Sequence, residues 1–407
     1  MKILLVAQWV KLPGFEGAAS HHTEFANALV KEGVKVHILV SSCEKEIAGA
    51  KVHNAGGKLP RPLLSYASSG RIEKICRDEK IDVIHKRMDP GSGFSVFAAK
   101  KAGVPIVAEI NFNPFSFEKR GSFLLDVVKP AVQHLPRVMW AKYFLPKADA
   151  VVCVSESVVE SLARHGVRNA ICIPNGVNIE KFRGAAEKGE KLKEKLKIEG
   201  EVIAIVGGLG PRHGLEGIMK CAKEMEDEFP NARFVIIGGV ERYREHVERM
   251  KKIAPSNVMF VGKVSEGELP AYLGMADVCL APFKEAMNKE EPYGFCPIKI
   301  LQYMGAGKAV VASRLPWIEE ILEEGRNAIL FGNENGIGEG KMRKWGREVD
   351  GRGIGMREAI ERLLRDKKLR ERMGKENERK ANEKYSWRAV AKEYIRVYGK
   401  LIKERKE

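Results

Sequence analysis

The chain has 407 residues, 44% of them hydrophobic and 30% charged, so it is long enough for about two or three cores and is not a disordered protein. Its net charge is +16, but the excess Lys and Arg is spread along the chain, which favours anionic partners in general over a nucleic-acid-binding arm. The seven Cys are scattered without a C-x-x-C pair, which is typical of reduced thiols and argues against a structural zinc motif.

The first half of the chain alternates short apolar runs with helical patterns. The run at 2–7 predicts a first strand rather than a signal peptide, because no cleavage pattern follows it. No apolar run in the sequence is long enough for a transmembrane helix. Further runs lie at 34–40, 81–86, 104–110, 149–155 and 171–175. Continuous apolar strands separated by helices predict a parallel sheet that is covered on both faces.

A stretch at 180–200 is charged and rich in small residues, and we expect it to be a linker. After it, the second half of the chain again alternates short apolar runs with helical patterns. The apolar runs are then 201–208, 232–239, 257–264, 277–283, 308–313 and 327–332. Two α/β domains in tandem are therefore predicted. The last helix, after Ser386, carries an apolar stripe that has to pack against another element.

Two glycines, Gly14 and Gly17, stand between the first strand and its helix. Glycine lets a backbone approach an anion and a helix N-terminus attracts one, so the loop is either a ligand-binding loop or a tight connection. His21 and His22 follow in the same helix. Either they contact a substrate hydroxyl, or they cap the helix and face solvent.

The second domain opens with VGGLGPRHGLEG at 206–217, which is similar to a dinucleotide-binding fingerprint. Gly208 and Gly210 are present, but His213 stands where a third Gly is required, and this weakens the interpretation as an NAD-dependent oxidoreductase. Arg212 and His213 at a strand–helix junction suit a diphosphate instead, since a cation and backbone N–H groups clamp such a group.

A stretch at 290–313 combines Glu291, Gly294 and Pro297 directly before a helix. Proline suits the first turn of a helix, and the free N–H groups of that turn attract an anion. A carboxylate beside them suits neutral hydroxyls. A sugar joined to a diphosphate has both kinds of group, so this stretch predicts a nucleotide-sugar site.

At this point the chain resembles the retaining glycosyltransferases of family 4, also described as glycosyl transferases group 1. The resemblance rests on segments in the family's order at 148–182, 206–218, 268–283, 291–313 and 373–398. It implies the GT-B fold, with two Rossmann-like parallel-sheet domains that face a cleft and a last helix that crosses back to the first domain. We therefore expect an acceptor-binding domain at 1–180 with 386–407 and a nucleotide-sugar-binding domain at 181–385.

In this family the first Glu of an E-x₇-E motif contacts the donor sugar, and Glu291 matches it. The second Glu holds the ribose and is missing here. Strict counting reaches Lys299, whereas aligning the phrase ILQYMGAGKAVVA reaches Gln302, which we prefer. Lys299 would then lie near the phosphates or at the surface. The family's Arg and Lys after the first strand of the second domain are replaced by Gly208 and His213, which leaves Arg212 as the expected diphosphate cation.

The resemblance implies further site residues. The remaining donor-binding candidates are Gly14, Gly17, Gly262, Lys263, Val264, Gly294, Phe295, Cys296 and Pro297. Many relatives have a His at the end of the strand at 104–110, where this chain has Glu109 and Asn111. That carboxylate either orients an acceptor hydroxyl or makes a structural contact. With His21, His22 and Arg87, these two residues form the expected acceptor set.

The resemblance also implies the reaction. A retaining enzyme of this type lets the acceptor attack from the face that the nucleotide leaves, and the departing diphosphate takes the proton. No metal and no cofactor beyond the substrate are expected, and we see no D-x-D motif. The leading interpretation is therefore a hexosyltransferase, and the alternatives are a non-catalytic nucleotide-sugar-binding homologue and, remotely, the oxidoreductase.

The acceptor side of the sequence is rich in aromatic and basic residues at 112–147, with prolines that interrupt its helices. This composition suits either a membrane surface with a lipid-linked acceptor, or helices that pack on the sheet and bind a glycan acceptor. We expect a cytoplasmic protein with peripheral contact to the inner face of the cell membrane and no nucleic-acid partner. The nucleotide base, the sugar and the oligomeric state stay open.

Overall fold

The computed structural model describes residues 1–12, 17–43, 47, 49–56, 61–89, 92–116, 135–284, 294–332, 342–344, 347–349, 354–405 and 407. The chain divides into two compact units. Unit 1 holds Met1–Gly176 and Trp387–Glu407 together with 294–296, and unit 2 holds 177–284 and Pro297–Ser386. Both units are α/β, as the alternating apolar runs predict.

Unit 1 is built on a seven-stranded sheet in the order β3-β2-β1-β4-β5-β6-β7. Its strands are β1 (Lys2–Leu12), β2 (Lys35–Cys43), β3 (Ala50–Asn54), β4 (Val83–Arg87), β5 (Ile106–Ile110), β6 (Ala150–Cys153) and β7 (Ala170–Cys172). All neighbouring pairs are parallel. The strand order changes direction between β1 and β4, and such a switch point is where α/β sheets bind ligands.

Helices cover both faces of this sheet, which explains why its strands are apolar on both sides. They are α1 (Gly17–Lys31), α2 (Arg61–Ala67), α3 (Ser69–Glu79), α4 (Phe94–Ala102), α6 (Glu156–Arg164) and α15 (Trp387–Glu404), with helical residues at 135–144 and a 3₁₀ turn, η1 (Leu145–Lys147). One core joins the sheet to α3, α4 and α6, and the other joins it to α1 and α15.

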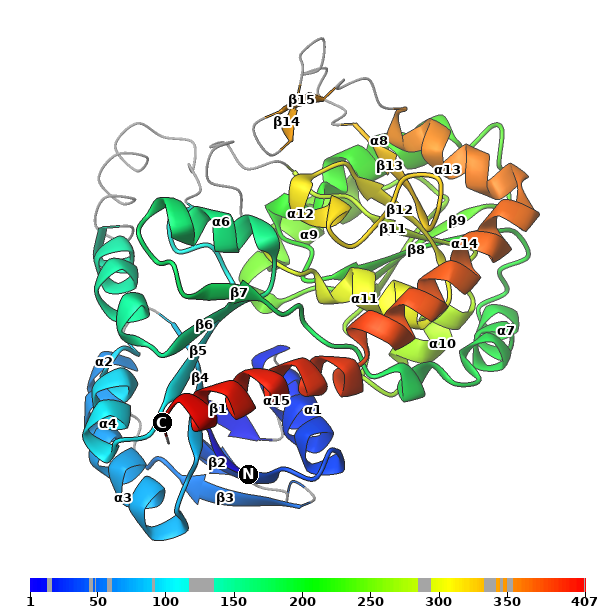
Figure 1. Ribbon diagram of the computed structural model, residues 1–407. Helices are drawn as coiled ribbons and strands as arrows, with labels where there is room; N and C mark the ends of the chain where they lie inside the picture. Colours follow the sequence, from blue (N-terminus) through cyan, green and yellow to red (C-terminus); the bar gives the residue numbers. More distant parts are fainter. Residues whose placement is uncertain are drawn as a thin grey trace. The chain divides into compact units, whose positions relative to one another are not determined.

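The last helix of the chain, α15, belongs to unit 1 and lies beside α1 (Figure 1). Its buried face packs Trp387 and Tyr394 against Phe25 of α1, with ring centroids 5.9 and 4.8 Å apart. The predicted return of this helix to the first domain is therefore confirmed. The apolar stripe seen in the sequence is the surface that makes this contact.

Unit 2 is built on a six-stranded parallel sheet in the order β10-β9-β8-β11-β12-β13. Its strands are β8 (Val202–Gly207), β9 (Arg233–Gly238), β10 (Val258–Gly262), β11 (Val278–Ala281), β12 (Ala309–Ser313) and β13 (Ala328–Phe331). The switch point of this sheet lies between β8 and β11. A separate antiparallel pair consists of β14 (Met342–Lys344) and β15 (Arg347–Val349).

The helices of unit 2 complete its layers. They are α7 (Ala185–Lys195), α8 (Leu215–Glu224), α9 (Arg244–Lys252), α10 (Leu269–Gly274), α11 (Ile298–Gly305), α12 (Pro316–Glu319), α13 (Met356–Arg365) and α14 (Lys367–Lys380). Short turns are η2 (Ile179–Phe182), η3 (Pro211–His213) and η4 (Glu241–Tyr243), and a π-helical turn, η5 (Ala381–Tyr385), follows α14. The core of this unit joins β8, β9, β11 and β12 to α8 and α13.

The prediction of a linker at 180–200 is wrong, because η2 and α7 occupy most of this stretch. Helix α7 packs closely on α10. A Cβ atom at Gly189 would lie 2.2 Å from the backbone nitrogen of Met275, and one at Gly274 would lie 1.7 Å from the carbonyl oxygen of Ala185. The glycine that suggests a linker in the sequence thus permits a close crossing of two helices.

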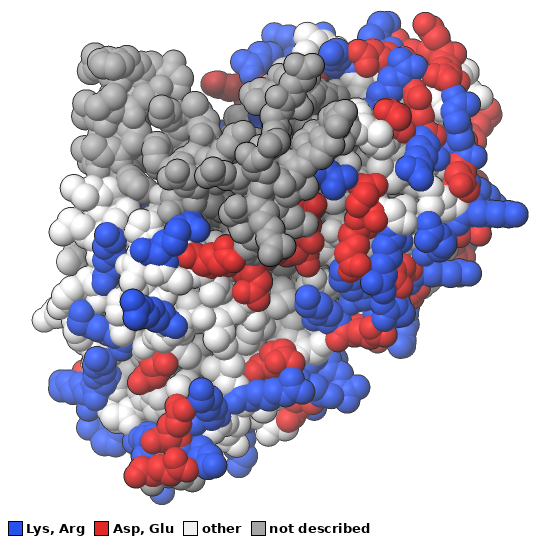
Figure 2. Space-filling view, turned by 45° about the horizontal axis from the view of Figure 1, so that its top comes forward, with Lys and Arg blue, Asp and Glu red and all other residues white. Residues whose placement is uncertain are grey.

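The surface carries charge of both signs. On the face shown in Figure 2, basic and acidic side chains are interspersed rather than separated into one basic band. Among the residues that the structure describes, no helix combines the length and the apolarity needed to cross a bilayer.

Candidate functional site

In unit 2 a tyrosine connects the two strands on either side of the switch point, β8 and β11. Strands β8 and β11 are paired at Ile203–Val278 and Ala204–Cys279. Beyond these pairs, the hydroxyl of the fully buried Tyr303 accepts a hydrogen bond from the Val206 nitrogen at 2.8 Å and donates to the Leu280 carbonyl at 3.3 Å. Tyr303 thereby fixes α11 against the carboxyl ends of β8 and β11.

Replacing Tyr303 with Phe should destabilise the protein by about 1–3 kcal/mol, because it leaves a buried N–H and a buried carbonyl without their partner. Urea denaturation of the purified variant measures this loss. The matched control is Tyr143→Phe, whose side chain is about half exposed. Equal stability of the two variants would show that the Tyr303 hydroxyl does not hold the two strands.

Lys299 lies one turn before Tyr303 on α11, and its side chain reaches Gly207 at the carboxyl end of β8. Its residue is 8% exposed, and its Nζ atom has no hydrogen-bond partner among the described residues. The Nζ atom lies 4.7 Å from the Phe283 ring centroid and 3.0 Å from where a Cβ atom of Gly207 would be. Burial lowers the pKa of Lys299 to about 7. Of the two expected locations, phosphates or surface, the surface is therefore wrong.

His213 lies in η3, which follows β8, and its Nε2 atom is 3.7 Å from where a Cβ atom of Gly207 would be. Its ring centroid is 5.7 Å from that of Phe283. Burial, together with the positive charge of Lys299 and Arg212, lowers the pKa of His213 to about 3, so its imidazole is neutral at neutral pH. Arg212 is exposed, and its carbonyl oxygen accepts a hydrogen bond from the Lys284 nitrogen at 3.0 Å. The buried amine beside His213 is therefore Lys299, and the expectation that Arg212 contacts the diphosphate stays a prediction.

The other expected donor residues are distributed over the two units. In unit 2, Gly208 follows β8, Gln302 lies partly exposed on α11, and Pro297 caps α11, which starts at Ile298 rather than at the proline. Three other candidates lie at the end of the edge strand β10, namely Gly262, Lys263 and Val264. This strand is two strands away from β8, which corresponds to about 10 Å.

The remaining donor candidates belong to unit 1 or lie outside the described residues. Gly17 begins α1, and Phe295 lies between Gly294 and Cys296 in the short described segment of unit 1. The Cys296 carbonyl accepts a hydrogen bond from the Asn175 side chain at 3.1 Å. Gly14 and Glu291 lie outside the described residues.

In unit 1 the expected acceptor residues surround one carboxylate. Glu109, near the carboxyl end of β5, is fully buried. The Nε2 atoms of His85 and His21 lie 2.9 and 3.2 Å from its oxygen Oε2, and the Asn111 amide donates to its other oxygen, Oε1. The Arg87 Nε atom lies 3.9 Å from Oε1. The structure thus brings Glu109, His21, Asn111 and Arg87 together, as the sequence analysis expects.

The charge of this cluster is set by its hydrogen bonds. Burial alone would raise the pKa of Glu109, but the charges and hydrogen bonds of His21 and His85 hold it well below its usual value. Burial lowers the pKa of His21, so a neutral imidazole donates to a carboxylate. Because His85 donates through Nε2, its Nδ1 atom accepts from the Tyr398 hydroxyl at 2.7 Å. Burial raises the pKa of Tyr398 well above its usual value, which keeps this donor protonated.

Sequence reasoning misses His85 and Tyr398. His85 is an inward-facing residue of β4, and Tyr398 belongs to the apolar stripe of α15, so neither looks functional in the sequence. A His within an apolar strand, four residues after Ile81, is the only signal that points to a buried polar partner.

His21 and His22 are both buried, so the alternative in which they face solvent is wrong. The Nδ1 atoms of both rings lack a hydrogen-bond partner among the described residues, as do Asn111 Oδ1 and Arg87 Nη1. Burial, followed by the charges of His21 and Arg87, lowers the pKa of His22 well below its usual value. Unsatisfied buried polar atoms around a carboxylate suit a polar ligand, because such atoms are costly without a partner. The His21–Glu109 pair can bind and orient a hydroxyl group.

Comparisons with known proteins agree with this geometry. The model of Glycosyltransferase Family 4 matches residues 15–181, and the model of Glycosyl transferases group 1 matches residues 200–339. The chain is 26% identical over 267 residues to the uncharacterized glycosyltransferase MJ1069 of Methanocaldococcus jannaschii, with 64% of this chain covered but only 61% of the relative. It is 24% identical to the phosphatidyl-myo-inositol mannosyltransferase of Mycobacterium leprae, with 95% and 93% covered.

Among solved structures, the chain is similar to Alr3699/HepE of Anabaena, which was crystallised with UDP and glucose. The TM-score is 0.68 at 15% sequence identity, and the match covers 98% of this chain and 99% of the other. At this identity the match shows the fold, which is the GT-B arrangement of two Rossmann-like domains.

Proposed function

The chain belongs to the family 4 glycosyltransferases, and from this premise we propose that it transfers a hexose from a nucleotide-sugar donor to an acceptor hydroxyl with retention of configuration. The observation that carries the proposal is Lys299, a buried amine at the switch point of the unit 2 sheet that has no hydrogen-bond partner in the part of the chain that the structure describes. A diphosphate bound there would satisfy Lys299 and replace the missing cations at Gly208 and His213. UDP and glucose in the Anabaena structure support a nucleotide-sugar as the donor class.

In the proposed mechanism, Lys299 stabilises the negative charge that develops on the leaving diphosphate. The free N–H groups of the first turn of α11 act on the same charge. Gln302 binds the ribose, and Glu291 binds the donor sugar, as the family resemblance implies. The leaving diphosphate takes the proton of the acceptor hydroxyl, which attacks from the same face of the sugar.

On the acceptor side, His21 positions the hydroxyl through its Nδ1 atom, which has no partner within the described ranges, and Glu109 fixes the orientation of that imidazole. The effect is positioning, which makes the attack effectively unimolecular. We propose no metal ion for the transfer step. Activity that persists in a chelator, and a product whose anomeric configuration by NMR equals that of the donor, are the expected results.

The experiment that tests the function is a thermal-shift screen against UDP-, GDP-, ADP- and dTDP-linked sugars, followed by an assay of transfer and of nucleoside diphosphate release. A ligand that binds only the native state raises the melting temperature. The proposal expects one nucleotide series to raise it and to support transfer. Binding without transfer would favour a non-catalytic homologue, and binding of NAD alone would favour the oxidoreductase.

Replacing Gln302 with Leu should raise the KM for the donor about tenfold and change kcat little. The ribose contact persists from the ground state to the transition state, so its loss weakens binding uniformly. Steady-state kinetics with the nucleotide-sugar found in the screen measure both constants. A loss confined to kcat would contradict the ribose contact.

We further propose that unit 1 contacts the surface of an anionic membrane. The helical residues 135–144 expose Met139 and Tyr143, which are 62% and 53% exposed, and Tyr66 of α2 is exposed as well. The ammonium group of Lys147 lies 3.5 Å from the centroid of the Tyr143 ring. Aromatic and basic side chains together suit anionic headgroups at the inner face of the cell membrane. The phosphatidyl-myo-inositol mannosyltransferase relative supports a lipid-linked acceptor as one candidate.

Sedimentation with vesicles distinguishes a membrane-binding surface from helices that only pack on the sheet of unit 1. Wild-type protein should bind phosphatidylglycerol vesicles more strongly than phosphatidylcholine vesicles, and Met139→Glu should weaken the binding. The control variant is Ile253→Glu, an exposed apolar residue of unit 2. Absence of binding to either vesicle would contradict the membrane proposal and favour a soluble glycan acceptor.

A further inference from the structure

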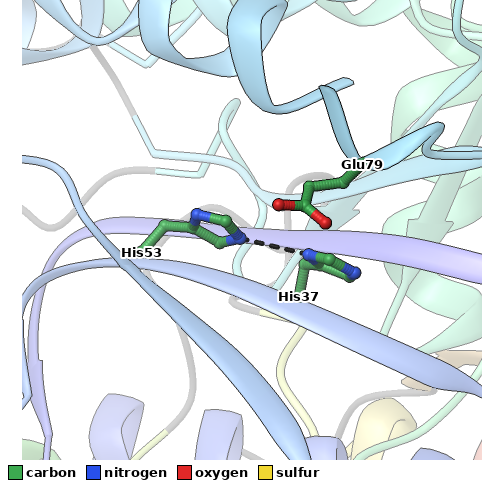
Figure 3. Close-up of side chains that lie close together, drawn as sticks. All are labelled: His37, His53 and Glu79. Carbon is green, nitrogen blue, oxygen red and sulfur yellow. Dashed lines mark hydrogen bonds between the residues drawn. The ribbon is translucent and has the colours of Figure 1, made fainter. Parts of the chain in front are cut away.

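A second cluster of polar side chains lies in unit 1 and shares no residue with the sets assigned to donor and acceptor. His37 is near the amino end of β2, His53 is on the edge strand β3, and Glu79 ends α3. In the register of the two strands, His37 pairs with Lys51 and Leu39 pairs with His53, so the two imidazoles share one face of the sheet. The two rings and the carboxylate point toward one another (Figure 3).

The distances in this cluster are close to those of a metal site. The His37 Nδ1 and His53 Nε2 atoms are 3.1 Å apart, and the rings are stacked with centroids 5.4 Å apart. With a carboxylate oxygen of Glu79, the candidate ligand atoms all lie within 4.8 Å of one another. A tetrahedral zinc ion with bonds of about 2.0–2.2 Å places its ligand atoms roughly 3.3–3.5 Å apart. The two nitrogens, at 3.1 Å, are slightly closer than this spacing, and the Glu79 carboxylate, whose side chain is 25% exposed, lies within 4.8 Å of both.

The protonation states also suit a cation. Burial lowers the pKa of His37 and of His53, so both imidazoles are neutral at neutral pH, as metal ligands have to be. The hydrogen bond from Lys51 lowers the pKa of Glu79, which keeps that carboxylate charged. The Lys51 Nζ atom lies 2.7 Å from Glu79 Oε1 and competes with a metal ion for this oxygen. The Lys51 side chain is 60% exposed, so it can move into water when an ion binds.

We propose that His37, His53 and Glu79 bind one zinc ion, with water as the fourth ligand. The ion replaces the hydrogen bond between the imidazoles and displaces Lys51 from Glu79. It thereby ties the edge strand β3 to β2 and α3. His₂Glu with one water is a ligand set and a coordination number that zinc accepts readily. This site takes no part in the proposed sugar transfer.

The test is calorimetric titration of the metal-free, full-length protein with ZnCl₂, together with its melting temperature. We expect one zinc ion per chain and a rise in melting temperature. The variant His53→Gln should bind zinc at least tenfold more weakly, and Lys51→Met should bind it more tightly, because the competing cation is gone. The matched control is His246→Gln, which removes a partly exposed imidazole of α9 in unit 2 and should bind zinc as the wild type does.

Cobalt(II) gives a second readout that does not depend on affinity. A tetrahedral site with nitrogen and oxygen ligands should give the strong visible absorption of four-coordinate cobalt, and His53→Gln should lose it. Zinc binding that is absent, or that survives unchanged in His53→Gln, overturns the proposal. The latter result would locate the ion elsewhere, for instance on one of the free thiols.

Discussion

Replacing Lys299 with Met should lower kcat/KM for sugar transfer by roughly 10²–10³-fold, because one preorganised charge contact to a developing anion contributes about 3 kcal/mol. The variant should nevertheless fold. Lys299 Nζ is buried without a hydrogen-bond partner among the described residues, so an apolar side chain of similar length relieves an unfavourable charge. The matched control is Lys220→Met, an exposed lysine of α8 in the same unit.

The stability difference between the wild type and Lys299→Met should depend on pH. The pKa of Lys299 is about 7 in the folded protein, against 10.5 for an ordinary lysine. The unfolded chain therefore binds more protons between these two values, and the free energy of unfolding of the wild type should rise with pH across this window. Below pH 7 both states carry the charge, so Lys299→Met should be the more stable protein, and its advantage should shrink toward pH 10.5.

Urea denaturation at several pH values, with transfer assays on the same preparations, measures both effects. A variant that keeps wild-type transfer would contradict the role of Lys299 at the diphosphate. A stability difference that does not change with pH would show that Lys299 is not a buried amine with a lowered pKa.

Replacing Glu109 with Gln should destabilise the protein by about 2–4 kcal/mol. Donors from His21, His85 and Asn111 converge on the carboxylate, and an amide has only one acceptor oxygen to offer them. The change leaves at least one buried donor unpaired and also removes a buried charge from its partners. Urea denaturation measures the loss, and transfer at saturating donor should show a raised KM for the acceptor.

The control for this prediction is Glu73→Gln, in the same unit. Its carboxylate pairs with an exposed Lys101, and such a surface pair contributes about 0–1 kcal/mol. If Glu109→Gln is no less stable than Glu73→Gln, the carboxylate does not organise the two imidazoles. If it is less stable but has a normal acceptor KM, Glu109 has a structural role alone.

The fold could be predicted because parallel strands that are buried on both faces leave continuous apolar runs. The runs at 2–7 and 201–208 correspond to β1 and β8, the central strands of the two sheets. The stretch at 180–200 differs from its prediction because its structure depends on a distant helix. Its charges and glycine indicate a linker, but Gly189 serves a close helix crossing that depends on α10, more than 70 residues later.

Site residues could be predicted where a sequence motif fixes their position. They could not be predicted where the function of a residue depends on its burial in the folded protein. The family phrase aligns Gln302 with the missing Glu but says nothing of Lys299, whose importance follows from its burial without a hydrogen-bond partner among the residues that the structure describes. In the same way, the sequence identifies Glu109, but only the fold shows that His85 and Tyr398 orient it. Contacts between residues hundreds of positions apart leave no local pattern to read.

The most direct test of the account is the number of protons taken up when a nucleoside diphosphate binds. The Lys299 amine, with a pKa of about 7, is mostly neutral at pH 8, and a diphosphate beside it should restore its charge. Calorimetry of the best nucleoside diphosphate from the screen, in buffers of different ionisation enthalpy, measures this number. The account predicts an uptake approaching about one proton at pH 8, little at pH 6, and none in Lys299→Met. Binding at pH 8 without proton uptake, or with the same uptake in Lys299→Met, would contradict it.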